Sequence, residues 1–175
     1  MVNPDVSIVI ISWRMRDYLY NCLKTIYEFT NGVTFEIIVI DNNSQDGTSE
    51  MIKMHFPQII LISNSENRGV APARNQGILK AKGNYILIMD ADMVLVENSI
   101  QKMYDFMEKT PSCGVVGCKL VDKNFQLQYS CKRFPTINSF IFRRLEFIPK
   151  IKKSKTLYYH IMQDWIIMKS EKLII

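Results

Sequence analysis

Val6-Ser-Ile-Val-Ile-Ile11 is a nearly continuous run of β-branched residues, and it decides the fold class of the chain. Such runs are typical of strands that are buried on both faces, as in a parallel sheet covered by helices. The segment that follows, residues 17–29, carries apolar residues at helical spacing and ends shortly before Gly32. The first 32 residues therefore predict a buried strand followed by an amphipathic helix.

The same alternation continues along the chain. Further apolar runs predict strands at residues 35–40, 59–62 and 85–89. Amphipathic segments predict helices at residues 48–56, 70–82 and 98–109. Strands that alternate with helices favour an α/β fold with a doubly wound, mostly parallel sheet flanked by helices.

The periodicity is weaker in the last third of the chain. Two strands are predicted at residues 115–120 and 127–132, with a turn between them. Residues 140–147 fit a helix and residues 148–155 a basic loop, whereas residues 158–175 show no clear period. We therefore place the end of the α/β domain near residue 135.

The chain has 175 residues, a formal net charge of +5 and an isoelectric point of about 9.0. Much of the positive charge lies between residues 132 and 155. A nucleic acid, an anionic membrane surface or an anionic substrate would each attract such a segment, and a solvated basic face is the plain alternative. No export signal opens the sequence and no cysteine spacing suits zinc, so we expect a cytoplasmic protein with reduced thiols.

Polar residues follow all four of the first predicted strands. They are Ser12 with Trp13, residues 41–44, Ser63 with Asn64, and Asp90 with Asp92. Ligands of an open parallel sheet bind outside the carboxyl ends of its strands. One edge of the sheet is therefore predicted to carry an aromatic ring, acids and several hydrogen-bonding groups.

Asp90-Ala91-Asp92 directly follows the strand predicted at residues 85–89. Alternate residues of an extended strand point the same way, so both carboxylates are expected on one side. Mg²⁺ and Mn²⁺ usually bind through one or two carboxylates together with substrate phosphates. The motif predicts a Mg²⁺ or Mn²⁺ site that neutralises a diphosphate leaving group, and a pair of acids in a surface turn is the alternative.

Asp41 ends a very apolar strand, where an unpaired carboxylate would be costly. It can accept a hydrogen bond from a nucleobase imide or a ribose hydroxyl, or it can start the turn at Asn42, Asn43 and Ser44. Trp13 can stack on a nucleobase or pack in the core. Asp41 is therefore either a ligand of the nucleotide or a turn residue, and Trp13 is either a stacking partner of the base or a core residue.

Two segments that contain arginine flank the start of the helix predicted at residues 70–82. Gly69 allows a positive φ or the close approach of a ligand, because it has no Cβ. Arg68 and Arg74 offer forked donors that suit phosphate. A capped helix with exposed arginines is the alternative interpretation.

Four motifs occur in a fixed order along the chain. They are residues 6–12, Asp41-Asn-Asn-Ser-Gln-Asp-Gly-Thr48, Asn67-Arg-Gly-Val-Ala-Pro-Ala-Arg-Asn-Gln-Gly77 and Leu87-Ile-Met-Asp-Ala-Asp92. Together they resemble the family 2 glycosyltransferases of GT-A fold, especially the bacterial rhamnosyltransferase-like branch, over residues 6–135. The resemblance implies a nucleotide-sugar-binding α/β domain at residues 1–135 and an incomplete acceptor-side segment with a basic loop at residues 136–175.

The resemblance also implies an activity and a site. A sugar would pass from a UDP- or dTDP-sugar to a saccharide or lipid-linked acceptor with inversion, in cell-surface polysaccharide biosynthesis, with Mg²⁺ or Mn²⁺ held by Asp92 and Asp90. Nucleic acid is not an expected partner. The basic loop is expected either to be solvated or to make peripheral contact with the inner face of the membrane. The residues implied for binding the nucleotide-sugar are Ser12, Trp13, Asp41, Asn43, Arg68, Gly69, Arg74, Asp90 and Ala91.

The sequence departs from this family where the catalytic base is expected. The family carries its base in a Glu-Asp motif well after the metal site, and this sequence contains no Glu-Asp pair. Asp164 is the late acid that we consider as a substitute base. The chain is interpreted either as a truncated enzyme or as a naturally short relative.

Two other functions compete with glycosyl transfer. A binding-only or inactive fragment would hold the nucleotide-sugar and transfer nothing. A haloacid-dehalogenase-like phosphatase also places a D-x-D motif after an apolar strand, with the first Asp as nucleophile. That motif usually opens the phosphatase fold, whereas three predicted strands precede it here.

Overall fold

The computed structural model describes residues 3–128, 133–145, 148 and 154–160. The chain forms two compact units, residues 1–117 and residues 118–174. The larger unit contains the sheet, and each unit is described by itself. The boundary at residue 135 between a nucleotide-sugar-binding domain and an acceptor-side segment stays a prediction.

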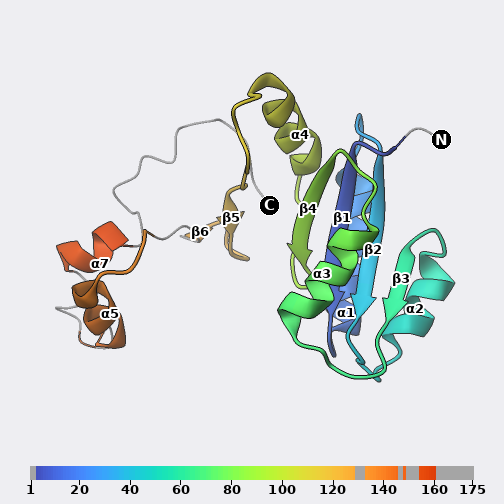
Figure 1. Cartoon of the computed structure of the whole chain (residues 1–175), viewed down its shortest axis with the longest axis horizontal. Coiled ribbons are helices and arrows are strands. Elements are labelled where there is room, and N and C mark those ends of the chain that lie inside the picture. The colour runs from blue at the N-terminus through green and yellow to red at the C-terminus, as the bar shows by residue number, and fades with distance from the viewer. Residues whose placement is uncertain (1–2, 129–132, 146–147, 149–153, 161–175) are drawn as a thin grey trace. The chain divides into compact units, whose positions relative to one another are not determined.

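A four-stranded parallel sheet forms the centre of the first unit (Figure 1). Its strands are β1 (Val6–Ser12), β2 (Phe35–Asp41), β3 (Ile60–Ser63) and β4 (Tyr85–Asp90). The spatial order is β3-β2-β1-β4, and every neighbouring pair is parallel. The predicted α/β fold with a mostly parallel sheet is therefore confirmed.

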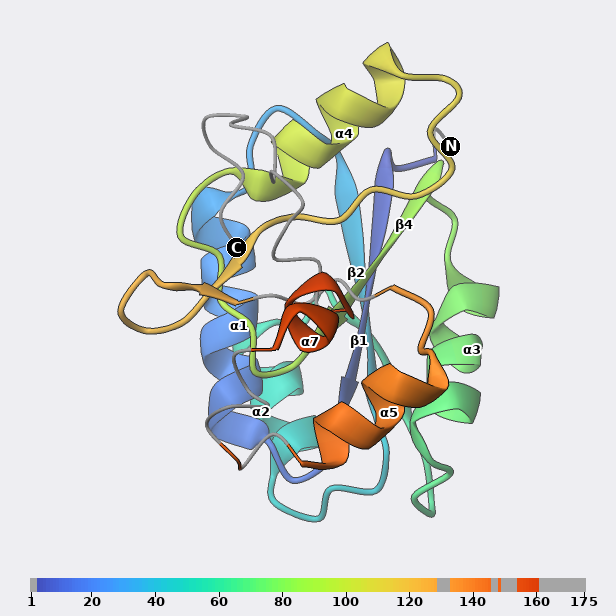
Figure 2. The ribbon, with the colours of Figure 1, turned by 90° about the vertical axis from the view of Figure 1, so that its left-hand side faces the viewer.

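Helices cover both faces of this sheet. They are α1 (Arg16–Phe29), α2 (Thr48–His55), α3 (Val70–Lys80) and α4 (Ser99–Lys109). Figure 2 shows α1 and α2 on one side of the sheet and α3 on the other. This arrangement explains the nearly continuous apolar run of β1, because Ile8, Val9 and Ile10 are all fully buried between the two layers.

Helix α3 lies directly on the sheet because of Gly77. A Cβ atom at this position would lie 2.7 Å from Cδ1 of Ile40 and would also collide with the side chain of Val9. Val9 and Ile40 belong to the cluster that packs against Ala73 of the same helix. The close contact holds the start of α3 at the carboxyl end of the sheet.

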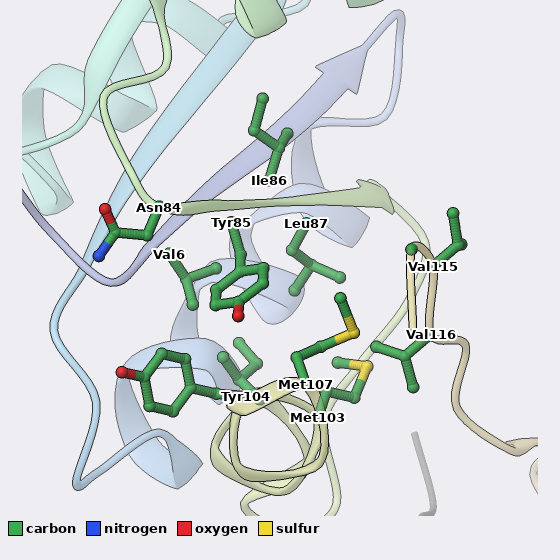
Figure 3. A pocket seen from close by; sticks show the side chains of 12 residues that line it. Val6, Asn84, Tyr85, Ile86, Leu87, Met103, Tyr104, Met107, Val115 and Val116 are labelled. Atoms are coloured by element: carbon green, nitrogen blue, oxygen red, sulfur yellow. The ribbon is translucent and has the colours of Figure 1, made fainter. Parts of the chain in front are cut away.

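Helix α4 packs beside β4 and leaves an apolar cavity of about 350 Å³ (Figure 3). Tyr85 and Leu87 of β4 line it, together with Met103 and Met107 of α4. The rings of Tyr85 and Tyr104 meet edge to face, with their centroids 5.8 Å apart. This cavity carries no acidic group among its lining residues and is separate from the strand ends that bear Asp41 and Asp90.

The second unit contains short elements. The strands β5 (Leu120–Val121) and β6 (Leu127–Gln128) form an antiparallel pair, and the helices are α5 (Ile137–Arg144) and α7 (Lys155–His160). The strand predicted at residues 115–120 was wrong for most of its length, since residues 115–118 form no strand. The end of the strand predicted at residues 127–132 lies outside the described residues.

Helix α5 begins at residue 137, three residues before the predicted start. Its first turn is held by a capping box, in which Ser139 N–H donates to Thr136 Oγ1 at 3.1 Å and Thr136 N–H donates to Ser139 Oγ at 2.8 Å. The apolar periodicity of residues 140–147 did not reveal this cap. In the part of the chain that the structure describes, no helix is long and apolar enough to cross a membrane.

Candidate functional site

The parallel register brings the polar strand ends together at one edge of the sheet. Ser12 pairs with Asp41 across β1 and β2, and Asp41 pairs with Ser63 across β2 and β3. On the other side of β1, Ile11 pairs with Asp90 of β4. The predicted convergence of the strand ends is confirmed, and the segments that follow each strand meet there.

Asp41 is buried and accepts two hydrogen bonds at this edge. Ser44 N–H donates to Oδ1 at 3.0 Å, and Ser49 Oγ donates to Oδ2 at 2.7 Å. Ser49 Oγ also lies 3.0 Å from Ser63 Oγ on the neighbouring strand. The carboxylate therefore shapes the turn after β2, which is one of the two roles that the sequence left open.

Asn42 is 2% exposed and ties the turn after β2 to the loop before α3. Its Nδ2 donates to Asn67 Oδ1 at 2.8 Å and to the Gly69 carbonyl at 3.3 Å. Its Oδ1 accepts from Asn64 Nδ2 at 3.0 Å and from Arg68 N–H at 3.1 Å. One side chain thus contacts four groups of the loop that carries Arg68.

Asn64 and Gln76 extend this set of amides. Gln76 Nε2 donates to Asn64 Oδ1 at 3.0 Å, and Asn64 Nδ2 donates in return to Gln76 Oε1 at 2.9 Å. The loop from Asn64 to Gly69 is thereby held at both of its ends. Sequence analysis placed Asn42 and Asn64 at this edge of the sheet, but it did not predict that they and Gln76 hold the loop before α3.

Arg68 and Gly69 lie in this loop, at the start of α3. Gly69 has a φ of 80°, the left-handed region that favours glycine, and its N–H donates to Asn67 Oδ1 at 2.9 Å. The side chain of Arg68 is exposed. A backbone turn without a Cβ therefore lies next to an accessible guanidinium, which is an arrangement that suits an anionic ligand.

Asp90 and Asp92 are both exposed, and Ala91 between them is buried. Asp90 Oδ1 lies 3.3 Å from Nη2 of Arg74, a residue of α3. No basic side chain among the described residues pairs with Asp92. The motif thus offers one paired carboxylate and one that is open to solvent.

Cys22 lies beneath the acidic motif and is a protonated thiol at neutral pH. Burial, and then the negative charge of Asp92, raise the pKa of Cys22 to about 12. Its Sγ contacts the Asp90 carbonyl at 3.9 Å. Since metal ligation by cysteine requires the thiolate, the oxygen atoms of the two aspartates are the ligands that this motif offers.

Ser12 and Trp13 follow β1 at the same edge. Ser12 is fully buried, and its Oγ has no hydrogen-bond partner in the described part of the chain. Trp13 is 48% exposed, with the Arg14 guanidinium 5.2 Å from its ring centroid. The tryptophan is therefore not the core residue that one interpretation predicted, and its ring is accessible to a flat ligand.

Asn43 and Asp46 belong to the turn after β2. Asn43 has a φ of 65°, and its Oδ1 accepts from Gln45 Nε2 at 3.1 Å. Asp46 accepts from Thr48 Oγ1 at 2.6 Å and from Arg16 N–H at 3.2 Å. Burial acts to raise the pKa of Asp46, but these bonds together outweigh it and hold the pKa below its usual 3.8.

This shift predicts an acid-dependent contribution of Asp46 to stability. Because the folded pKa is lowered, the contribution is present above about pH 3.8 and is lost as the pH falls through the folded value. We expect Asp46→Asn to lower the urea midpoint at pH 6, and we expect that difference to shrink below pH 3.8. Urea unfolding followed by circular dichroism at both pH values measures it. A difference that does not change with pH would contradict the prediction.

The remaining predicted site residue is Asp164. Asp164 lies outside the described residues, so its predicted role as a base stays a prediction. Within the described part of the chain, no three His, Cys, Asp or Glu side chains form a cluster that could hold a metal by themselves.

Comparison with known proteins assigns this arrangement to a family. The model of glycosyl transferase family 2 matches residues 7–169. An uncharacterised glycosyltransferase of Bacillus subtilis, YfnE, is 32% identical over 114 residues, which cover 63% of this chain and 29% of that protein. The Escherichia coli glucosyltransferase WfaP is 31% identical over 134 residues, or 76% of this chain and 53% of that protein. The chain thus spans about half or less of the length of these relatives.

Solved structures show the same fold. TarS 1–349 of S. aureus in complex with UDP-GlcNAc superposes with a TM-score of 0.58 at 18% identity, over 79% of this chain and 42% of that one. The Pyrobaculum calidifontis mannosyltransferase PcManGT in complex with GDP-Man and Mn²⁺ gives 0.55 at 22% identity, over 69% and 36%. The parallel sheet with its helices is therefore the GT-A fold that the sequence resemblance implied, and the chain belongs to glycosyl transferase family 2.

Proposed function

We propose that this chain is the donor-binding part of an inverting glycosyltransferase that takes its sugar from a UDP- or dTDP-sugar. The observation that carries the proposal is the meeting of Asp41, the Arg68–Gly69 loop and the Asp90-Ala91-Asp92 motif at one edge of a parallel sheet. This edge is where ligands of open α/β sheets bind. Two of the similar TarS structures are complexes with UDP and with UDP-GlcNAc, and they support a nucleotide-sugar ligand.

The end of β1 and the turn after β2 would hold the nucleoside. Asp41 would bind the base or ribose through the lone pairs that Ser44 and Ser49 leave available. The accessible ring of Trp13 would stack on the base, with Asn43 and the unpartnered Oγ of Ser12 close by.

The loop before α3 and the helix itself would hold the diphosphate. Arg68 is exposed and Gly69 exposes its backbone, so both are available to phosphate oxygens. Arg74 lies at 3.3 Å from Asp90, and its Nε is buried without a partner among the described residues. A phosphate next to this pair would satisfy the guanidinium and relieve the unpaired Nε.

Asp92 and Asp90 would hold Mg²⁺ or Mn²⁺, with Ala91 packing beneath them. The donor set fits, because it consists of two exposed carboxylates and leaves coordination positions for phosphate oxygens and water. The ion would supply charge neutralisation of the departing nucleoside diphosphate. The PcManGT structure, a complex with GDP-Man and Mn²⁺, supports divalent metal use in this fold.

The transfer itself would be a single displacement. The oxygen of the acceptor hydroxyl forms a bond to the anomeric carbon while the bond from that carbon to the phosphate oxygen breaks, and the hydroxyl proton passes to a carboxylate base. Asp164 is the candidate base of this chain. The acceptor would be a saccharide or a lipid-linked saccharide, as the name of WfaP, a UDP-Glc:α-D-GlcNAc-diphosphoundecaprenol β-1,3-glucosyltransferase, supports.

The setting of this reaction would be cell-surface polysaccharide biosynthesis. The relatives TuaG of Bacillus subtilis and ExoO of Rhizobium meliloti carry teichuronic acid and succinoglycan biosynthesis in their names. Both relatives are about 30% identical to this chain over more than half of it. We infer that this chain also acts in the biosynthesis of a cell-surface polysaccharide.

A binding-only protein is the second candidate function. The sequence holds no Glu-Asp pair at which the family's base would lie, and that observation favours binding without transfer. The two candidates share the donor site and differ in turnover. Release of free sugar from a radiolabelled UDP- or dTDP-sugar, with and without acceptors, separates them.

Calorimetric titration tests the donor site. UDP, dTDP, GDP and ADP are titrated separately into the full chain, each with and without Mn²⁺. We expect UDP or dTDP to bind in a metal-dependent manner and more tightly than GDP or ADP. Absence of binding by all four nucleotides, in a chain that circular dichroism shows to be folded, would overturn the proposal.

A further inference from the structure

We propose that the second unit carries a docking surface for an anionic lipid bilayer, formed by residues 133–136, by α5 and by the start of α7. The proposal does not rest on the donor site, because every residue involved lies between positions 132 and 160. It assigns the partner of the basic segment, for which the sequence left a solvated loop as the alternative. Three observations carry it.

The first observation is an exposed apolar face. Ile137, Phe140 and Ile141 lie three and four residues apart, on one side of α5, and are 81%, 64% and 47% exposed. Phe134, just before the helix, is 97% exposed. On the other side of the helix Ser139 is buried. Large apolar side chains gathered on one exposed face are typical of an interaction surface rather than of a solvated loop.

The second observation is the charge that surrounds this face. Arg143 and Arg144 occupy the last turn of α5, and Lys155 begins α7; all three are exposed. In sequence, the segment from Lys132 to Lys155 contains eight Lys or Arg residues and one acid, Glu146. An apolar helical face with basic residues beside it fits a surface of acyl chains under anionic headgroups.

The third observation is a cavity next to the start of α5. Its volume is about 400 Å³, and its lining includes Arg133, Lys155 and His160. The hydroxyl-bearing residues Thr136 and Ser139 line the same cavity. Basic groups and hydroxyls around one cavity suit a phosphate group, which is the part that anionic phospholipids present at the bilayer surface.

The aliphatic side chains of this face favour a bilayer over a nucleic acid, which is the other polyanion that basic residues attract. A nucleic acid would use the basic residues and could stack bases on Phe134 and Phe140. It would gain little from Ile137 and Ile141, which have no ring to stack. A bilayer uses both features, because the apolar side chains enter the headgroup boundary while the arginines remain at the level of the phosphates. We therefore infer a lipid surface as the partner.

Vesicle sedimentation tests this surface with the full chain. We expect binding to vesicles of phosphatidylcholine with phosphatidylglycerol, little binding to phosphatidylcholine alone, and release at high salt. Arg143→Gln with Arg144→Gln should weaken the partition coefficient by about thirtyfold, since each basic residue near the surface contributes roughly fivefold. Arg143→Lys with Arg144→Lys should restore most of it, because the charge is retained.

The apolar contribution is tested by Ile137→Ser with Phe140→Ser. These side chains are exposed, so the change should leave the fold intact and weaken vesicle binding by roughly tenfold or more. Leu79→Ser with Lys80→Gln is the matched control, because it removes an exposed apolar and an exposed basic side chain from α3 of the first unit. This control should bind as the wild type does.

Three results would overturn the proposal. Equal binding to neutral and anionic vesicles would remove the role of the arginines. Vesicle binding that the Ile137 and Phe140 substitutions leave unchanged would remove the role of the apolar face. Binding of a single-stranded oligonucleotide without vesicle binding would assign the segment to a different partner.

Discussion

Asp92→Asn is expected to abolish the part of UDP or dTDP binding that depends on Mn²⁺, a loss of roughly 100-fold or more. The physical reason is the loss of the carboxylate that no basic side chain of the described structure neutralises. A metal held by this carboxylate would neutralise diphosphate charge and contribute several kcal/mol, and each 1.4 kcal/mol is tenfold in affinity. Calorimetry with and without Mn²⁺ measures the loss directly.

Two comparisons make this result specific. Glu28→Gln removes one negative charge from the exposed surface of α1, near the opposite end of the sheet, and should bind as the wild type does. Addition of EDTA to the wild type should lower its affinity to that of Asp92→Asn. Metal-dependent binding that persists in Asp92→Asn would show that the ion is held elsewhere.

Asn42→Ala is expected to weaken UDP binding by about tenfold or more and to lower the free energy of unfolding by about 1–3 kcal/mol. Asn42 is buried, and its amide contacts four groups of the loop between Asn64 and Gly69. Without it, that loop loses the contacts that present Arg68 and the Gly69 backbone to a diphosphate. Asn42 therefore acts as a positioning residue.

Comparison of UDP with UMP separates positioning from general destabilisation. UMP lacks the second phosphate, so a displaced Arg68 loop should weaken UDP binding more than UMP binding. Asn42→Asp keeps the acceptor for Arg68 N–H and should lie between the wild type and Asn42→Ala. Asn98→Ala is the matched control, because Asn98 joins α4 to Asn31 through its amide and has no contact with this loop. Equal losses for UDP and UMP would contradict the positioning role.

Much of the first unit could be predicted because its elements depend on short-range patterns. The nearly continuous β-branched run of β1 predicts a strand buried on both faces, and Ile8, Val9 and Ile10 are fully buried. The prediction failed where such patterns were short. Residues 115–118 are apolar enough for a strand, yet they do not pair, because pairing requires a partner strand that sequence periodicity cannot supply.

By itself, the sequence determined that polar residues follow four apolar strands, and a parallel sheet places all of its strand ends at one edge. It determined Asp41, Asp90 and Asp92 as the acids of that edge. Only the tertiary structure decided how they are used. Arg74 meets Asp90 because Gly77 lets α3 lie directly on the sheet, and Asn42 meets Arg68 because the turn after β2 reaches the loop before α3. These contacts join residues 16 and 26 positions apart, and such distances are set by packing and strand register rather than by local periodicity.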